Sequence, residues 1–468
     1  MKPSLESLTP EQKRAMLARL LEQQQATCKT AFMLQAVYLN TLIQPAPVWN
    51  IRFTVRYFHK FEPELLRARM QRIVERHPAL RTTYHLPPQH EADYRSRLMG
   101  IRTGAVKPCE INFDRLVEQR VHPSHALEFK VVEARDWSVE ELRLALQQDA
   151  AEPYDLGRLP ICRLRMYRRE NEDVVQFDVH HIAMDLWSLE QVLAELEKPE
   201  EGPAPPSFAE FCAWQQAWFS LPKAEAMRQW WRQQLEGCPD LAFPQLTGKA
   251  DSDSVSFQIG LELLTLARQH CKTYKVTLFN LLLSAYQVTL GHMMERDDLA
   301  VGGTIANRPD QRFDHSIGFF SHLVLYRRKL REVGSWSELW AQNRETIRDV
   351  FDRQFFPLTS TMPTPRTDFW LLFNQFRNAH WLEGSYGEDL GMRSGGVLDG
   401  PLGPWELVTV DLPYNTAPVL LEAFERKTEV EGLFRYRLEC FDRETARRYV
   451  EEFQTRLRAS LENPEACL

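Results

Sequence analysis

The sequence predicts an α/β protein built from two lobes. Three observations support this prediction: a length of 468 residues with 44% hydrophobic content, an alternation of strand-like and helix-like segments, and one proline-rich break. Chains of this length usually divide their interior between more than one core. Strands that alternate with helices are typical of α/β folds. We therefore expect one α/β lobe on each side of the break.

The first lobe is expected over residues 30–198. Residues 49–58, W-N-I-R-F-T-V-R-Y-F, alternate apolar with polar side chains and predict a strand with one buried face. A helix is predicted from Pro63, with an apolar stripe, and Pro78 ends it. The further elements expected in this lobe are a strand near 127–132, a helix at 138–150 that starts with a capping box, and strands at 161–167 and 173–179.

Residues 199–206, P-E-E-G-P-A-P-P, are predicted to be the linker, because they are rich in proline and lack any apolar period. The second lobe is expected over residues 207–468. Its predicted elements are helices at 208–235, 265–293 and 442–462 and strands at 255–263, 300–305, 323–326 and 433–440. Two long loops, at 356–367 and 384–404, are expected to have a function.

Residues 1–29 are interpreted as an N-terminal helical appendage. The start at Thr9 and Pro10 favours a helix over residues 9–25, with one leucine stripe. This helix either packs on its own lobe or serves as a docking element for a partner.

Composition and charge exclude several classes of protein. The formal net charge of −7 gives no basic footprint for nucleic acid. The eight cysteines are widely spaced without a C-x-x-C pair, so neither a zinc ribbon nor a disulfide framework is predicted. No signal peptide and no apolar run of about 18 residues is present, so we expect a cytoplasmic protein without a membrane span.

The segment Val179 to Gln191, V-H-H-I-A-M-D-L-W-S-L-E-Q, is the one that indicates a chemistry. If the preceding strand continues, His180 and His181 point to opposite faces. Ser188 is predicted to start a capping box, which places Asp185 on the loop before the helix. No metal site is predicted, because a histidine and an aspartate four residues apart share a metal only when both lie on one helix.

An imidazole at a strand end can accept a proton or a hydrogen bond from an attacking amine or hydroxyl near neutral pH. The alternative is a buried histidine pair with a purely structural role. The thirteen residues alone do not separate these two interpretations.

Five stretches together resemble condensation domains of non-ribosomal peptide synthetases, within the chloramphenicol acetyltransferase-like clan. The central segment resembles the H-H-x-x-x-D-G signature. Four others are similar to the family's R-H-x-x-L-R-T, Y-x-D-F-x-x-W-Q, V-G-x-x-x-A-N-R and I-G-x-F segments, in the right order: residues 76–82, 207–215, 301–309 and 317–320. The resemblance covers nearly the whole chain after residue 30.

The resemblance implies two acetyltransferase-like lobes in a V-shaped pseudo-dimer around a central tunnel, with a floor at 301–309 and a latch at about 384–404. It implies acyl transfer from a 4′-phosphopantetheine thioester, on a donor acyl or peptidyl carrier protein, to an amine or hydroxyl. The product would be an amide or ester in non-ribosomal peptide or hybrid polyketide biosynthesis.

No cofactor is expected on the protein itself. The acceptor is either carrier-bound or a free small molecule. Since the 468 residues contain no adenylation or carrier domain, we expect a stand-alone, monomeric enzyme whose carriers act in trans.

The resemblance also implies roles for single residues. His181 would be the catalytic residue, as a base or a positioning hydrogen-bond acceptor. His180 and Asp185 would be structural, with Asp185 paired to Arg308. The other residues that the match places in the tunnel or its motifs are Leu186, Trp187, Ser188, Arg81, Asn307 and His322.

Three departures from the family pattern stand out. Leu186 replaces a glycine, and leucine cannot easily provide the positive φ or the close approach to a pantetheine arm that glycine allows, so we expect a narrower or reshaped tunnel. Ser321 and His322 replace V-N, and residues 353–358, R-Q-F-F-P-L, replace most of H-Q-D-x-P-F-E. These departures motivate an alternative function, a catalytically silent condensation-like docking domain that binds carrier proteins and recruits partner enzymes. The intact histidine pair and aspartate favour the enzyme.

Overall fold

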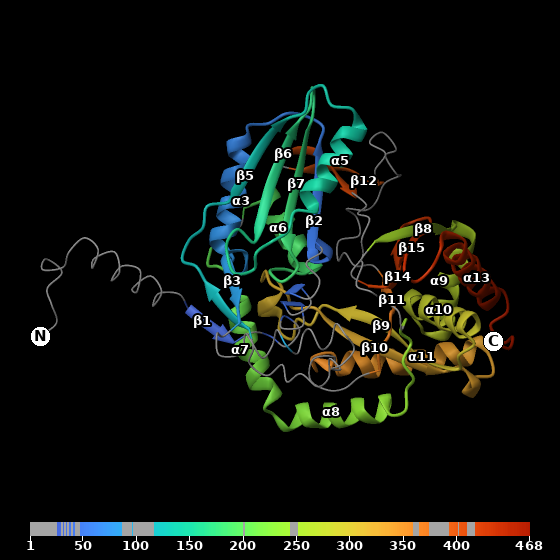
Figure 1. Ribbon diagram of the computed structural model, residues 1–468. Coiled ribbons are helices and arrows are strands. Elements are labelled where there is room, and N and C mark those ends of the chain that lie inside the picture. The colour runs from blue at the N-terminus through green and yellow to red at the C-terminus, as the bar shows by residue number, and fades with distance from the viewer. Residues whose placement is uncertain are drawn as a thin grey trace, which may run out of the picture.

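The protein is a mixed α/β molecule, and its described residues form two six-stranded sheets and one three-stranded sheet (Figure 1). The computed structural model describes the backbone of 26–29, isolated residues between 31 and 96, and the ranges 47–86, 117–199, 202–243, 251–358, 365–373, 393–400, 402–409 and 417–468. The helix predicted over 9–25 lies outside these residues.

The first six-stranded sheet has the strand order β12-β13-β2-β7-β6-β5. Only β5 and β6 run parallel to each other, and the other neighbours are antiparallel. The strands predicted near 127–132, 161–167 and 173–179 are confirmed with shifts of one or two residues. The strand bounds are β2 Asn50–Tyr57, β5 Glu128–Glu133, β6 Cys162–Arg168, β7 Asp173–His180, β12 Arg393–Gly400 and β13 Gly403–Thr409.

Helices cover both faces of this sheet. On one face α3 (Pro63–Arg76) and α6 (Leu186–Glu197) pack on the inward side chains of β2 and β7, and α5 (Val139–Ala150) packs on the other. The predicted helices at Pro63 and 138–150 are confirmed, including the capping box at Ser138. The strand at 49–58 was predicted to have one buried face. Thr54, on its polar face, is buried as well because α5 lies above it.

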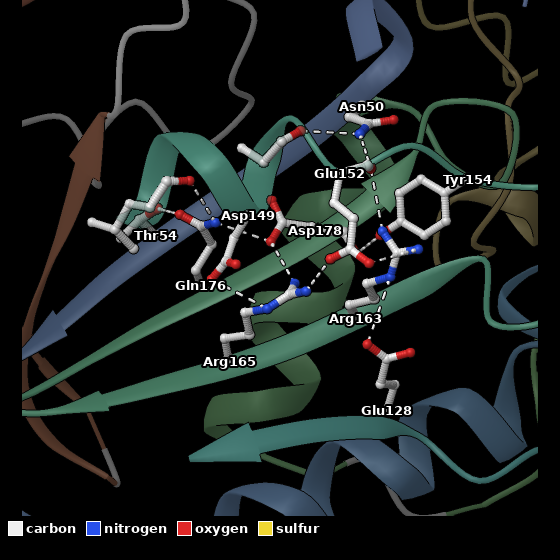
Figure 2. A network of polar contacts seen from close by, with 12 residues as sticks. Asn50, Thr54, Glu128, Asp149, Glu152, Tyr154, Arg163, Arg165, Gln176 and Asp178 are labelled. Atoms are coloured by element: carbon white, nitrogen blue, oxygen red, sulfur yellow. Dashed lines mark hydrogen bonds and ion pairs between the residues drawn. The ribbon is translucent and has the colours of Figure 1, made fainter. Parts of the chain in front are cut away.

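A buried polar network lies beneath α5 (Figure 2). Asp178 of β7 is fully buried, and its Oδ2 accepts a hydrogen bond of 3.0 Å from Gln176 Nε2. Arg165 Nη1 lies 3.7 Å from the same oxygen, and this guanidinium also pairs with Asp149 and Glu152. Burial raises the pKa of the Asp178 carboxyl to about 7, because Arg165 and Gln176 offset only part of the lost hydration.

The second six-stranded sheet has the order β10-β9-β11-β14-β15-β8. Its strands are β8 Ser252–Ile259, β9 Asp298–Ile305, β10 His322–Lys329, β11 Phe369–Phe373, β14 Val419–Glu425 and β15 Val430–Arg437. Its helices are α9 Leu261–Tyr274, α10 Leu278–Met294, α11 Trp336–Asp352 and α13 Arg443–Glu462. The predicted strand at 255–263 is wrong at its end, because Gly260 caps α9 and the helix starts directly after it.

Helix α10 is buried at almost every position, as its apolar sequence predicts. Its buried amide and hydroxyl side chains Asn280, Ser284 and Gln287 are hydrogen-bonded internally. Asn280 Nδ2 donates to Trp340 O at 2.9 Å, and Asn343 Nδ2 donates to Ser284 Oγ and Gln287 Oε1, both at 2.8 Å. Hydrogen bonding of this kind removes most of the cost of burying an amide or hydroxyl.

The hairpin of β12 and β13 joins the second half of the chain to the first sheet. Strand β13 pairs with β2, from Trp405 opposite Tyr57 to Val408 opposite Thr54. Leu402 and Trp405 also enter the hydrophobic cluster of the first half. Within the predicted latch at 384–404, residues 393–400 and 402–404 belong to this hairpin, and the remainder lies outside the described residues.

The two halves are connected through residues 202–207, which form neither helix nor strand, and then α7 (Phe208–Phe219) and α8 (Pro222–Leu235). The three-stranded sheet contains β1 (Ala26–Lys29), β4 (Glu118–Val121) and β3 (Thr82–His85), in that order. No helix in the described part of the chain combines the length and apolar character that crossing a membrane requires.

Candidate active site

His181 lies where β7 ends and the chain turns toward α6. Its backbone N–H donates to Trp49 O at 2.7 Å, and its ring Nδ1 lies 2.8 Å from Met184 O. A carbonyl only accepts hydrogen bonds, so Nδ1 carries the proton and Nε2 of the neutral ring has a free lone pair. Within the described residues, nothing hydrogen-bonds Nε2.

Burial lowers the pKa of His181, while the Met184 carbonyl and the nearby Asp185 carboxylate offset part of this effect. The ring is therefore neutral at physiological pH. A neutral imidazole with an anchored Nδ1–H can accept a proton at Nε2.

His180 is buried with the opposite tautomer. Its Nδ1 accepts the Ile182 N–H at 3.1 Å, so the proton is on Nε2, which donates to Thr41 Oγ1 at 3.3 Å. The Thr41 hydroxyl in turn donates to Val37 O at 2.9 Å. Burial, with a smaller effect of His181, lowers the pKa of His180 to about 3. Both ring nitrogens are used in internal contacts, which fits a structural role.

The polar network under α5 reaches this strand end (Figure 2). Asn50 lies opposite His180 in the β2–β7 register, and its amide donates to Ala150 O and Glu152 O at 3.0 and 2.9 Å. The Tyr154 hydroxyl donates to the Asp178 carbonyl at 2.9 Å, and its ring meets His180 edge-on at 6.2 Å. These contacts hold the segment after α5 against the end of β7.

Asp185 is the N-cap of α6, with Oδ1 accepting the Ser188 N–H at 2.8 Å. The predicted capping box at Ser188 is therefore wrong, since the helix begins at Leu186. The second oxygen of the aspartate carboxylate, Oδ2, accepts the N–H groups of Phe320 and Ser321, each at 3.1 Å. One buried carboxylate thus joins the start of α6 to the second half of the chain.

Arg308 completes this junction. Its Nη2 lies 3.1 Å from Asp185 Oδ1 and 3.0 Å from Ser188 Oγ, and the two charged side chains are 2% and 3% exposed. The guanidinium also stacks 4.0 Å above the Phe320 ring. Asn307, just before it, has φ +50°, a left-handed conformation that asparagine tolerates better than most residues. Arg308 and Asp185 are therefore held in one geometry.

Leu186 is the first residue of α6 and is not among the described residues with positive φ. The conformational reason for expecting a reshaped tunnel is therefore wrong, because leucine is compatible with this backbone. Its side chain is half-buried against the core of the first half. Trp187, beside it, donates from Nε1 to Asp314 O at 2.9 Å, a further contact between the halves.

Arg81 and His322, the two remaining residues that the motif match placed in the tunnel or its motifs, donate hydrogen bonds to backbone carbonyls. The Arg81 guanidinium donates to His122 O, and to Glu75 O at 3.3 Å. His322 is buried at the start of β10, and its Nε2–H donates to Gln354 O. Two of the departures from the family pattern, 321–322 and 353–358, therefore contact each other. Burial lowers the pKa of His322 to about 4.

Two aromatic residues beside His181 were not predicted as site residues. Trp49 was assigned to the buried face of a strand, and Phe319 occupies the variable position of the I-G-x-F segment. A variable position carries no motif signal. The one indication of Phe319 in the sequence was therefore its place next to Gly318. Within the described ranges, no group of three or more histidine, cysteine or acidic side chains is arranged to hold a metal ion.

Comparison with known proteins identifies the family. The condensation-domain profile matches residues 111–468. A linear gramicidin synthase of Brevibacillus parabrevis is 25% identical over 453 residues, which is 91% of this chain but only 8% of that protein. The chain thus spans a small fraction of the length of such relatives.

Two solved structures share the fold. The X-domain from teicoplanin biosynthesis, solved in complex with OxyB, gives a TM-score of 0.75 at 17% identity and covers 100% of this chain and 97% of its own. The condensation domain of the Monacolin K polyketide synthase MokA gives a TM-score of 0.73 at 14% identity. The match covers 94% of this chain and 99% of the MokA domain. The fold is therefore chloramphenicol acetyltransferase-like, and the chain belongs to the condensation-domain family.

Proposed function

We propose that the chain transfers an acyl group from a phosphopantetheine thioester on a carrier protein to an amine or hydroxyl acceptor, forming an amide or ester. The observation that carries this proposal is the state of His181. Its Nδ1–H is anchored on Met184 O, and its Nε2 is free within the described residues. Membership of the condensation-domain family supports the reaction class.

In the proposed step, the neutral amine or hydroxyl attacks the thioester carbonyl while His181 Nε2 accepts its proton or hydrogen bond. The C–S bond breaks, and the proton passes on to the departing pantetheine thiolate. The Met184 carbonyl and the nearby Asp185 carboxylate favour the transient imidazolium. The donor and acceptor carriers, the tunnel between the halves and the stand-alone organisation stay predictions.

Replacing the proposed base tests this function. His181→Ala is expected to reduce product formation from an acyl-loaded carrier by about 10²–10⁴-fold, the usual contribution of a positioned base. Intact-protein mass spectrometry of the carriers measures product. The control is His292→Ala, because the side chain of His292 is 58% exposed. Near wild-type turnover by His181→Ala, with the fold retained, would refute the assignment.

The second candidate function is a docking domain that binds carriers and recruits partner enzymes without catalysis. One observation favours it: the X-domain from teicoplanin biosynthesis, which has the same fold, was solved bound to OxyB. Stable carrier binding with no product across a broad panel of amine and hydroxyl acceptors would favour docking. Product that depends on His181 would exclude it.

A further inference from the structure

Two aromatic rings contact the imidazole of His181, one from each half of the chain. The Phe319 ring meets it edge-on, with centroids 4.8 Å apart and an interplanar angle of 76°. The Trp49 ring is tilted by 58° at 6.0 Å. Edge-to-face pairs at these separations attract one another and restrict how the rings rotate. We refer to Trp49 and Phe319 as the aromatic bracket.

The backbone on both sides of Phe319 is held in place. The Gly318 carbonyl accepts the Asp185 N–H, and the Phe320 N–H donates to the Asp185 carboxylate, both at 3.1 Å. A Cβ added at Gly318 would lie 2.4 Å from the Phe208 ring, so only glycine allows this close approach. Phe319 is therefore fixed beside His181 by the same carboxylate that caps α6.

The surroundings of the bracket are apolar. Phe319 belongs to the hydrophobic cluster of the first half, and Trp49, Leu186 and Leu323 are half-buried at the border of that cluster. The described charges near it, Asp185 and Arg308, are paired with each other and buried. No ion pair or hydrogen bond joins a charged side chain to the His181 ring in the described part of the chain.

Building on the proposed acyl transfer, we propose that the aromatic bracket positions the His181 imidazole and favours the transfer of apolar acyl groups over acyl groups that carry a carboxylate. A carboxylate brought here would lose hydration without gaining a cationic partner, because Arg308 is already paired with Asp185. An alkyl or aromatic group would instead gain from burial against the rings. The bracket also excludes water from His181, in agreement with the direction in which burial shifts its pKa.

The first arm of the test uses diethyl pyrocarbonate, which carbethoxylates neutral imidazole, with His181 followed by peptide mass spectrometry across pH. In the wild type, the midpoint of reactivity is expected below the ordinary histidine value of about 6.5. Phe319→Ser and Trp49→Leu, made separately, should each move it upward. The control Phe351→Ser should not, because Phe351 is 61% exposed. Unmoved midpoints in both bracket variants would overturn the positioning role.

The second arm compares hexanoyl and adipoyl thioesters of N-acetylcysteamine, which differ by a terminal carboxylate. The hexanoyl probe should protect His181 at a concentration about tenfold lower than the adipoyl probe. Equal protection, or none by either, overturns the selectivity. Protection of His181 can be measured without turnover. A lack of product from loaded carriers would therefore count against the proposed function, while the comparison of the two probes would still test the selectivity.

Discussion

At the scale of single residues, the two adjacent histidines differ in which nitrogen carries the proton. His180 donates from Nε2, and His181 donates from Nδ1. The difference follows from their partners, because His180 faces a backbone N–H while His181 faces a carbonyl. Two identical side chains in sequence therefore have different capabilities, and only His181 keeps a free acceptor within the described residues.

The Asp185–Arg308 pair gives a prediction about stability. Arg308→Ala leaves the Asp185 carboxylate buried without its cation, which should lower the free energy of unfolding by roughly 3–5 kcal/mol. Arg312→Ala is the control, because its pair with Asp310 is about half exposed and such pairs contribute about 0–1 kcal/mol. Denaturant titration measures both, and equal losses in the two variants would contradict a buried junction.

Some site residues could be predicted from the sequence and others could not. The motif match implied the pair of Asp185 and Arg308, which the structure shows at 3.1 Å. The backbone N–H groups of Phe320 and Ser321, which bind the same carboxylate, have no signature of their own. A backbone amide is present in every residue except proline, so its role depends on folding alone.

At the scale of elements, local signals decided what was predictable. The helix at Pro63, the one capped by Ser138 and α13 after Asp442 were predicted because prolines, capping side chains and apolar stripes act over a few residues. Helix α11 was missed although Ser335 caps it with the same kind of local signal. Strands β11 and β14 were not predicted either. The two strands are neighbours in the sheet yet distant in sequence, and such pairing has no local signal.

The β12–β13 hairpin gives a prediction at this scale. Gly403 has φ +96°, and an added Cβ would lie 2.2 Å from the His59 ring, so Gly403→Ala should destabilise the hairpin by about 1–3 kcal/mol. Amides of residues 402–409 should then exchange faster with deuterium. Gly260→Ala is the control, since no atom lies within 4 Å of its added Cβ. Unchanged exchange in Gly403→Ala would show that the turn adapts.

At the scale of the whole molecule, buried ionisable groups make stability depend on pH. The pKa values of His180 and His322, about 3 and about 4, lie below the unfolded value near 6.5. The unfolded chain therefore binds more protons as pH falls from about 6.5, and each histidine reduces stability over that range. Asp178 acts in the opposite sense, because its pKa is raised to about 7 and the folded state binds its proton first.

A comparison of variants isolates one of these effects. His322→Asn removes a histidine that must stay neutral, so the fall in unfolding free energy from about pH 6 to pH 5 should be roughly 1 kcal/mol smaller than in the wild type. Urea titrations at both pH values measure the difference. His292→Asn, at an exposed position, should follow the wild type. If the unfolding free energy of His322→Asn falls between the two pH values by as much as that of the wild type, the His322 imidazole is protonated in the folded state without cost.

The crossing hairpin also sets an order of events during synthesis. Strand β2 has β7 on one side and β13 on the other, and β13 lies about 350 positions later in the chain. Until the ribosome has released residues 393–409, β2 is an unprotected sheet edge that can pair with another chain. The first half of this protein is made early but completed late, and any pause in translation before residue 393 prolongs the time in which it can aggregate.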